Sequence, residues 1–348
     1  MTILAERVEF VIGVDTHKQS HVAAVVSSNG GKLDERTVAA TQAGYEELLD
    51  FAAHHRGRRA WAIEGTSSYG AGLSALLAAR GEEVIEIDSP RRAKRRRGAK
   101  SDAIDAVRAA RDALGQHRHA APKHGDTRAA LRVLLVARSS AVDAHATAQR
   151  QLHDLVVTCP EEVRSTLRNR TPRTLITACE QLQAPAHADI HTATAVATLR
   201  ALANRIRTLQ TESKNHHKAI TALVQSWRGD LLELFGLGPI GAAIILCSWS
   251  HPERFHSEAA FAMLAGVAPL PASSGQTVRH RLNRFGDRQL NNVLHVIAQH
   301  RMQRDPTTKA YVQQRRAQGK TTAEIRRNLK RYIARQIYRQ LENPPTNP

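Results

Sequence analysis

Residues 9–15 read E-F-V-I-G-V-D, a short apolar run that ends in an acidic residue. A run of this kind is typical of a buried strand, with Asp15 near its carboxyl end. Residues 22–26 predict a second strand, and the turn N-G-G at 29–31 leads to a third strand over residues 36–39. We therefore expect the chain to open with an antiparallel meander.

The next segments alternate between helix and strand patterns. A helical pattern begins at Tyr45, and R-R-A-W-A-I-E-G at 58–65 predicts a strand that ends in Glu64. A helix over 69–80, closed by Gly81, and a strand over 83–87 follow. The order β-β-β-α-β-α-β-α is that of the ribonuclease-H-like α/β fold, which we expect over residues 1–125.

A basic run and two acids meet in the stretch S-P-R-R-A-K-R-R-R-G-A-K-S-D-A-I-D-A at 89–106. With Ser101 as N-cap, Asp102 and Asp105 share one face of the first turn of a helix. Alone, such a pair is usually an exposed helix start, because acids interact favourably with the helix dipole there. Together with Asp15 and Glu64 at strand ends, however, it predicts a four-acid site with the oxygen ligands that Mg²⁺ prefers.

The charge of the chain indicates a nucleic-acid partner. Its 348 residues include 50 Lys and Arg against 32 Asp and Glu, a net charge of +18, while aromatic residues make up only 4%. Phosphate contacts are therefore expected to dominate over stacking on aromatic side chains. The expected phosphate contacts in the basic run and in the basic loop at 269–288 are Arg91, Arg92, Lys94, Arg95, Arg96, Arg97, Lys100, Arg279, Arg281, Arg284 and Arg288.

Other classes of protein are disfavoured. No stretch approaches the roughly 18 apolar residues of a membrane-spanning helix, and the N-terminus lacks a signal-peptide pattern, so we expect a cytoplasmic protein without a membrane partner. The cysteines at 159, 179 and 247 are odd in number and far apart, which supports neither a disulfide framework nor a zinc ribbon. We interpret the 18 scattered histidines as surface or partner-facing residues, not as zinc ligands.

The middle of the chain, residues 126–228, has long helical patterns. Apolar residues from Leu131 to Val156 suit one amphipathic helix. A heptad seam follows with alternating steps of three and four, at Leu199, Leu202, Ile206, Leu209, Ser213, His216, Ile220, Leu223 and Trp227. Two interpretations stay open, an intramolecular hairpin with the earlier helix and a coiled-coil arm for dimerisation.

The last part, residues 229–348, is mainly helical. Residues 231–248 predict two apolar helical pieces around Gly236, Gly238 and Gly241, a helix-hairpin-helix pattern whose backbone amides can hold a DNA phosphate. A plain turn between helices would look similar. Thr321 and Glu324 predict a capping box for a last helix with an apolar side from Ile325 to Leu341.

Several blocks resemble the DEDD transposases of insertion sequences, a family that includes pilin-gene invertases and bridge-RNA-guided recombinases. The N-terminal blocks are V-I-G-V-D-T ending at Thr16, A-I-E-G-T-S-S-Y ending at Tyr69, and K-S-D-A-I-D-A ending at Ala106. The C-terminal blocks, in order along the chain, are F-G-L-G-P-I-G, F-A-M-L-A-G-V-A-P, S-S-G-Q-T-V-R and F-G-D-R-Q-L-N-N-V-L. Two departures are Gly65-Thr66-Ser67, where Ala-Thr-Gly is usual, and Leu270-Pro271-Ala272, which lacks the usual basic and aromatic residues.

The resemblance implies a RuvC-like domain in which Asp15, Glu64, Asp102 and Asp105 bind Mg²⁺. It further implies a C-terminal transposase domain with Ser274 as nucleophile, Ser273 being its neighbour, and an oligomer, dimer or tetramer, whose active sites combine subunits. The partners that it implies are the DNA of the element ends and target, and a guide RNA encoded by the element. The serine would form a covalent phosphoserine intermediate in DNA strand exchange.

Three other functions remain as alternatives. A nuclease of the Holliday-junction-resolvase type would use the same acids with water as nucleophile. A non-catalytic nucleic-acid-binding regulator would keep the acids for structure only. An actin-like or sugar-kinase ATPase shares the opening meander, but no later glycine-rich nucleotide motif is visible in the sequence, and a net charge of +18 argues against it.

Overall fold

The computed structural model describes residues 3–87, 102–271, 280–281, 283 and 286–344. The chain divides into two compact units, one formed by residues 1–125 with 249–256 and the other by residues 126–248 with 257–348. Within the described residues, no helix is long and apolar enough to cross a membrane. Each unit is described separately below.

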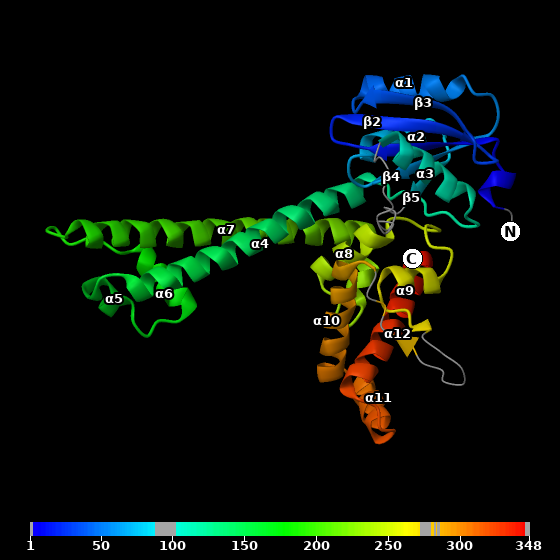
Figure 1. Ribbon diagram of the computed structural model, residues 1–348. Coiled ribbons are helices and arrows are strands. Elements are labelled where there is room, and N and C mark those ends of the chain that lie inside the picture. The colour runs from blue at the N-terminus through cyan, green and yellow to red at the C-terminus, as the bar shows by residue number, and fades with distance from the viewer. Residues whose placement is uncertain (1–2, 88–101, 272–279, 282, 284–285, 345–348) are drawn as a thin grey trace. The chain divides into compact units, whose positions relative to one another are not determined.

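The first unit contains a mixed five-stranded sheet (Figure 1). Its strands lie in the order β3-β2-β1-β4-β5, with β2 antiparallel to both neighbours and β4 parallel to β1 and β5. The elements are η1 (Leu4–Glu6), β1 (Phe10–Thr16), β2 (Ser20–Ser27), β3 (Lys32–Ala39), α1 (Gln42–Ala53), β4 (Arg59–Glu64), α2 (Ala71–Ala79), β5 (Val84–Ile87) and α3 (Asp102–Leu114). The expected order of strands and helices is confirmed, and it is consistent with a nuclease-like α/β domain.

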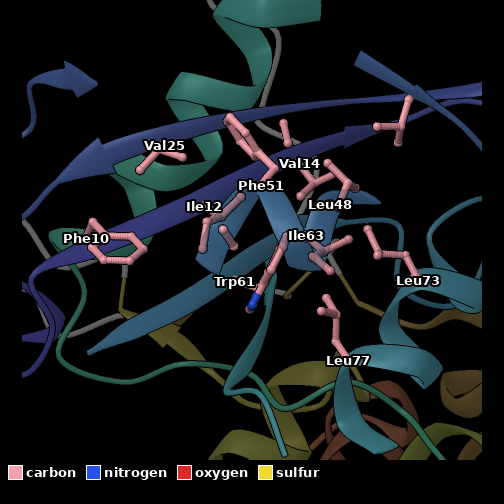
Figure 2. Close-up of a cluster of buried hydrophobic side chains, with 13 residues drawn as sticks. Phe10, Ile12, Val14, Val25, Leu48, Phe51, Trp61, Ile63, Leu73 and Leu77 are labelled. Carbon is pink, nitrogen blue, oxygen red and sulfur yellow. The ribbon is translucent and has the colours of Figure 1, made fainter. Parts of the chain in front are cut away.

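The two faces of this sheet are covered by different helices because alternate residues of β1 point to opposite sides. Phe10, Ile12 and Val14 pack with Leu48 of α1 and Leu73 of α2, as Figure 2 shows. On the other side, a second core contains Val11 of β1, Ala62 of β4 and Ile85 of β5, against Ala110, Ala113 and Leu114 of α3. The sheet therefore carries α1 and α2 on one face and α3 on the other.

The second unit contains a long pair of helices, α4 (Asp126–Thr158) and α7 (Ile190–Arg228). They pack side by side, with α5 (Glu161–Leu167) and α6 (Pro172–Glu180) at one end of the pair (Figure 1). The core at that end contains Leu152 of α4 and Leu199 and Ile206 of α7, together with the buried Cys159 and Cys179. The heptad seam of α7 thus contributes to packing within one chain.

The remaining elements of the second unit are mostly short helices. They are η2 (Gly229–Glu233), α8 (Pro239–Trp249), α9 (Glu258–Leu264), β6 (Leu270–Pro271), β7 (His280–Arg281), α10 (Arg288–Arg304), α11 (Pro306–Ala317) and α12 (Thr322–Glu342). The capping box of Thr321 and Glu324 at the start of α12 is confirmed, and so is the buried side of that helix, with Ile325, Leu329, Ile333, Ile337 and Leu341.

Candidate metal centre

Asp15 lies next to the last residue of β1, on the face of the sheet that α3 covers. Its side chain is only 13% exposed. Residues 11, 13 and 15 of β1 share this face, because side chains alternate along a strand. Gly13 is the residue that lets α3 come close, since a Cβ there would overlap the carbonyl oxygen of Ala106 and lie 2.8 Å from the backbone nitrogen of Ala110. The helix backbone therefore rests directly on the strand beside Asp15.

Asp102 and Asp105 belong to the first turn of α3, as the sequence indicates. Asp102 lies one helical turn before Ala106, and Asp105 directly precedes it, so the packing at Gly13 places both acids toward the carboxyl end of β1. Asp102 is half-exposed, whereas Asp105 is 21% exposed and accepts a 2.6 Å hydrogen bond from Arg108, with which it forms an ion pair. Ser101 and the basic run before it lie outside the described residues.

Glu64 is the last residue of β4. Because β4 is parallel to β1, the carboxyl ends of the two strands lie at the same edge of the sheet. The hydroxyl of Thr16 donates a 2.9 Å hydrogen bond to the carbonyl oxygen of Glu64 and joins the two strand ends. Gly65 follows with φ of +70°, a left-handed conformation that favours glycine and turns the chain away immediately after the acid.

The electrostatics of Asp15 reflect all four acids. Burial raises the pKa of Asp15, His17 lowers it, and the negative charges of Asp102, Glu64 and Asp105 raise it further. Negative charges gathered around a carboxylate whose pKa they raise are unfavourable for folding but favourable for binding a divalent ion. The structure thus brings the four predicted acids into one electrostatic neighbourhood.

His17 is a member of this group that the sequence analysis did not single out. Its Nε2 atom lies 3.3 Å from Oδ2 of Asp15 and 3.3 Å from Oδ2 of Asp102. One ligand atom from each of these three residues lies within 4.8 Å of the others, a spacing that fits a shared metal ion. The signal that could have identified His17 is its position two residues after Asp15, just beyond the end of β1.

The interpretation of the histidines as surface residues is wrong for His21. His21 is fully buried, with its ring stacked on Tyr45 at 5.5 Å between centroids. His17, by contrast, is exposed, and it contacts two carboxylates of the candidate centre. The burial of His21 follows from the register of β2, because this residue pairs with Thr16 at the end of β1.

The predicted nucleophile and most predicted phosphate contacts lie outside the described residues. These are Ser274 and its neighbour Ser273, and the basic residues Arg91, Arg92, Lys94, Arg95, Arg96, Arg97, Lys100, Arg279 and Arg284. Arg281 is described only as part of the short strand β7. Arg288 is exposed at the start of α10.

The glycine segment at 236–241 joins the 3-10 helix η2 to α8, so the first expected helical piece is a single short turn. Gly236 has φ of +87°, and a Cβ on Gly241 would lie 2.9 Å from Leu237 and 3.2 Å from Val293. Gly238 has no atom within 4 Å of such a Cβ. Turn geometry and packing on α10 thus account for two of the three glycines.

Comparisons with known proteins agree with this geometry. A family model of DEDD transposases of the IS110 type matches residues 12–159, and a model described as the transposase IS116/IS110/IS902 family matches residues 229–313. The chain is 32% identical over 102 residues to the insertion element IS110 uncharacterized 43.6 kDa protein of Streptomyces coelicolor. That match covers 29% of this chain and 25% of the relative, so the chain spans about a quarter of the relative's length.

Proposed function

This chain belongs to the IS110 family of DEDD transposases, and we propose that it cuts and rejoins DNA as the transposase and site-specific recombinase of an insertion sequence. The observation that supports the proposal is that Asp15 and Asp102 offer ligand atoms within 4.8 Å of each other, while the charges of Glu64 and Asp105 raise the pKa of Asp15. The net charge of +18 supports DNA as the partner, because phosphate contacts dominate nucleic-acid affinity.

The four acids come from elements that hold them in place. Asp15 is the second-last residue of β1, Glu64 is the last residue of the adjacent β4, and Asp102 and Asp105 lie in the first turn of the helix packed on Gly13. Hard carboxylate oxygens suit Mg²⁺, which we propose as the cofactor. A bound metal ion would hold the scissile phosphate and balance the negative charge that develops on it.

We propose Ser274 as the nucleophile on the basis of the family resemblance. Its Oγ–phosphorus bond would form while the bond from phosphorus to the leaving nucleotide oxygen breaks, and that oxygen would take up a proton. The phosphodiester energy would then be kept in a protein–DNA bond until the second DNA end attacks the phosphoserine. This chemistry suits strand exchange, whereas attack by water would give cleavage alone.

The division of labour along the chain and the other partners also rest on the resemblance. We propose residues 1–125 as the catalytic domain, 126–228 as a helical region that also joins subunits into a dimer or tetramer, and 229–348 as the transposase domain. Gly236, Gly238 and Gly241, together with Arg288 and the basic run, are proposed DNA contacts. A guide RNA encoded by the element is the proposed second nucleic-acid partner.

A suicide DNA substrate tests the mechanism. Wild-type protein with Mg²⁺ is expected to form a covalent protein–DNA adduct, which Ser274→Ala abolishes and Ser273→Ala largely keeps. Asp15→Asn, Glu64→Gln, Asp102→Asn and Asp105→Asn are each expected to lower the yield of metal-dependent product by about 100-fold or more. Most of the salt-sensitive DNA binding should remain, because basic residues elsewhere provide it.

Other results of the suicide-substrate experiment would indicate a nuclease or a non-catalytic regulator instead. Metal-dependent cleavage without an adduct would indicate the resolvase-like nuclease and contradict the serine mechanism. Strand exchange by Ser274→Ala would contradict it as well. DNA binding without any metal-dependent product would leave only a non-catalytic regulator.

A further inference from the structure

His17 is held at the metal centre by a tight hairpin. Thr16 of β1 pairs with His21 of β2, and the backbone nitrogen of His17 donates a 3.0 Å hydrogen bond to the carbonyl oxygen of Ser20. Only Lys18 and Gln19 lie between the two bonded residues, as in a two-residue hairpin. The backbone of His17 is therefore fixed by the strand pairing, not by a long loop.

The direction of the imidazole follows from the strand. Residues 13 and 15 succeed one another on the face of β1 that α3 covers, and His17 follows one residue beyond the end of the strand. Gly13 contacts the α3 backbone around Ala106, while Asp15 and His17 lie near Asp102, one turn earlier in the helix. His17 thus reaches the two carboxylates from the hairpin between β1 and β2, whereas Glu64 belongs to β4 and Asp102 belongs to α3.

The distances match those between neighbouring ligands of one ion. Ligand atoms about 2.1 Å from an octahedral ion, at right angles to each other, lie about 3.0 Å apart. Nε2 of His17 is 3.3 Å from one oxygen of Asp15 and 3.3 Å from one oxygen of Asp102. The three atoms are therefore close to ligand positions already, and a shift of a few tenths of an ångström would complete the set.

The chemistry of this donor set differs from that of four acids alone. Carboxylates suit Mg²⁺, Ca²⁺ and Mn²⁺, whereas an imidazole nitrogen is a typical ligand of first-row transition metals and a poor one for Mg²⁺. With the acids as the proposed metal site, we propose that His17 is a direct ligand of the ion bound by Asp15 and Asp102. The imidazole makes this centre favour Mn²⁺ over Mg²⁺.

Binding of Mn²⁺ to the full-length protein tests this assignment by electron paramagnetic resonance. The wild type is expected to show hyperfine coupling from one imidazole nitrogen to bound Mn²⁺. His17→Gln should lose this coupling and bind Mn²⁺ about tenfold or more weakly, while Mg²⁺ affinity, measured by competition, changes less than about threefold. His54→Gln is the matched control, since His54 is an exposed histidine of the same unit, and it should behave as the wild type.

Two results would overturn the assignment. The first is nitrogen coupling that persists in His17→Gln. The second is bound Mn²⁺ that depends on Asp15 but shows no nitrogen coupling in the wild type, in which case His17 only balances charge beside the acids. Asp15→Asn separates this failure from failure of the proposed function, because Mn²⁺ binding that is unchanged in Asp15→Asn would exclude the acidic centre itself.

Discussion

Two acids of the first unit, Glu82 and Asp15, have opposite electrostatic environments. Glu82 accepts hydrogen bonds from Nε of Arg59 and from the indole of Trp61, both at 2.9 Å, and the Arg59 bonds lower its pKa. Asp15 is buried beside three other acids, and its pKa is raised. The first arrangement stabilises the charged form in the fold, whereas the second leaves negative charge for an added cation to neutralise.

Glu82→Gln is expected to lower the free energy of unfolding at pH 7 by about 1–2 kcal/mol, because the charged hydrogen bonds to Arg59 and Trp61 are weakened. The folded pKa of Glu82 lies below its usual value of 4.5. Its stabilising effect is thus complete above that value and is lost as pH falls through the folded pKa. Urea unfolding at several pH values should show the difference from wild type shrinking in acid.

Asp15→Asn is expected to change the free energy of unfolding in the opposite direction. Urea unfolding with a chelator present measures this change. Because the folded pKa of Asp15 is raised above 3.8, the folded state keeps its proton longer and stability falls as pH rises past that value. Removing this charge should therefore stabilise the metal-free protein at pH 7. A loss of stability in Asp15→Asn would contradict the raised pKa.

Among the elements, the contact between β1 and α3 determines the geometry of the centre. Gly13→Ala is expected to push α3 away from the strand, because the new methyl group would overlap the backbone at Ala106. We expect a loss of about 1–3 kcal/mol in the free energy of unfolding and weaker Mn²⁺ binding, since Asp102 moves with the helix. Chemical denaturation and a Mn²⁺ titration measure the two effects.

The matched control for this substitution is Gly229→Ala, at the end of α7, where a Cβ would meet no atom within 4 Å. It should leave Mn²⁺ affinity unchanged. If Gly13→Ala lost stability but kept wild-type Mn²⁺ affinity, α3 would not be what positions Asp102 for metal.

At the scale of the whole molecule, the first unit is completed by a segment far along the chain. Residues 249–256 belong to it, although they follow more than a hundred residues of the other unit. Arg254 donates 3.1 Å and 3.2 Å hydrogen bonds to the carbonyl oxygen of Ala121 and to Glu86 of β5. Glu86 also accepts a 2.9 Å hydrogen bond from Thr66, two residues after Glu64, so the returning segment reaches the neighbourhood of the acids.

Arg254→Gln is expected to lower the free energy of unfolding of the first unit by about 3 kcal/mol, since the pair with Glu86 is 7% and 17% exposed and a buried carboxylate would lose its cation. Faster hydrogen exchange in β5 and around Thr66 should accompany the loss. Arg7→Gln is the control, because its pair with Glu83 is 46% and 41% exposed and should contribute less than about 1 kcal/mol. Equal effects of the two substitutions would argue against a role for the returning segment.

The order of the elements and the positions of the four acids along them follow from local sequence patterns. The periods of two and 3.6 residues are local, so strand ends at Asp15 and Glu64 and the helix start at Asp102 can be recognised without tertiary contacts. The long helices α4 and α7 and the capped α12 follow from the same periodicity.

The contacts that these elements make with one another depend on tertiary packing. That Gly13 allows α3 onto β1, that His17 reaches Asp15 and Asp102, and that Arg254 returns to Glu86 are contacts between residues with no shared periodicity. Local pattern carries no information on which helix face meets which strand, because that choice depends on the shape and burial of both surfaces at once. The positions of the acids could be predicted from the sequence for this reason, whereas the contact of His17 with Asp15 and Asp102 could not.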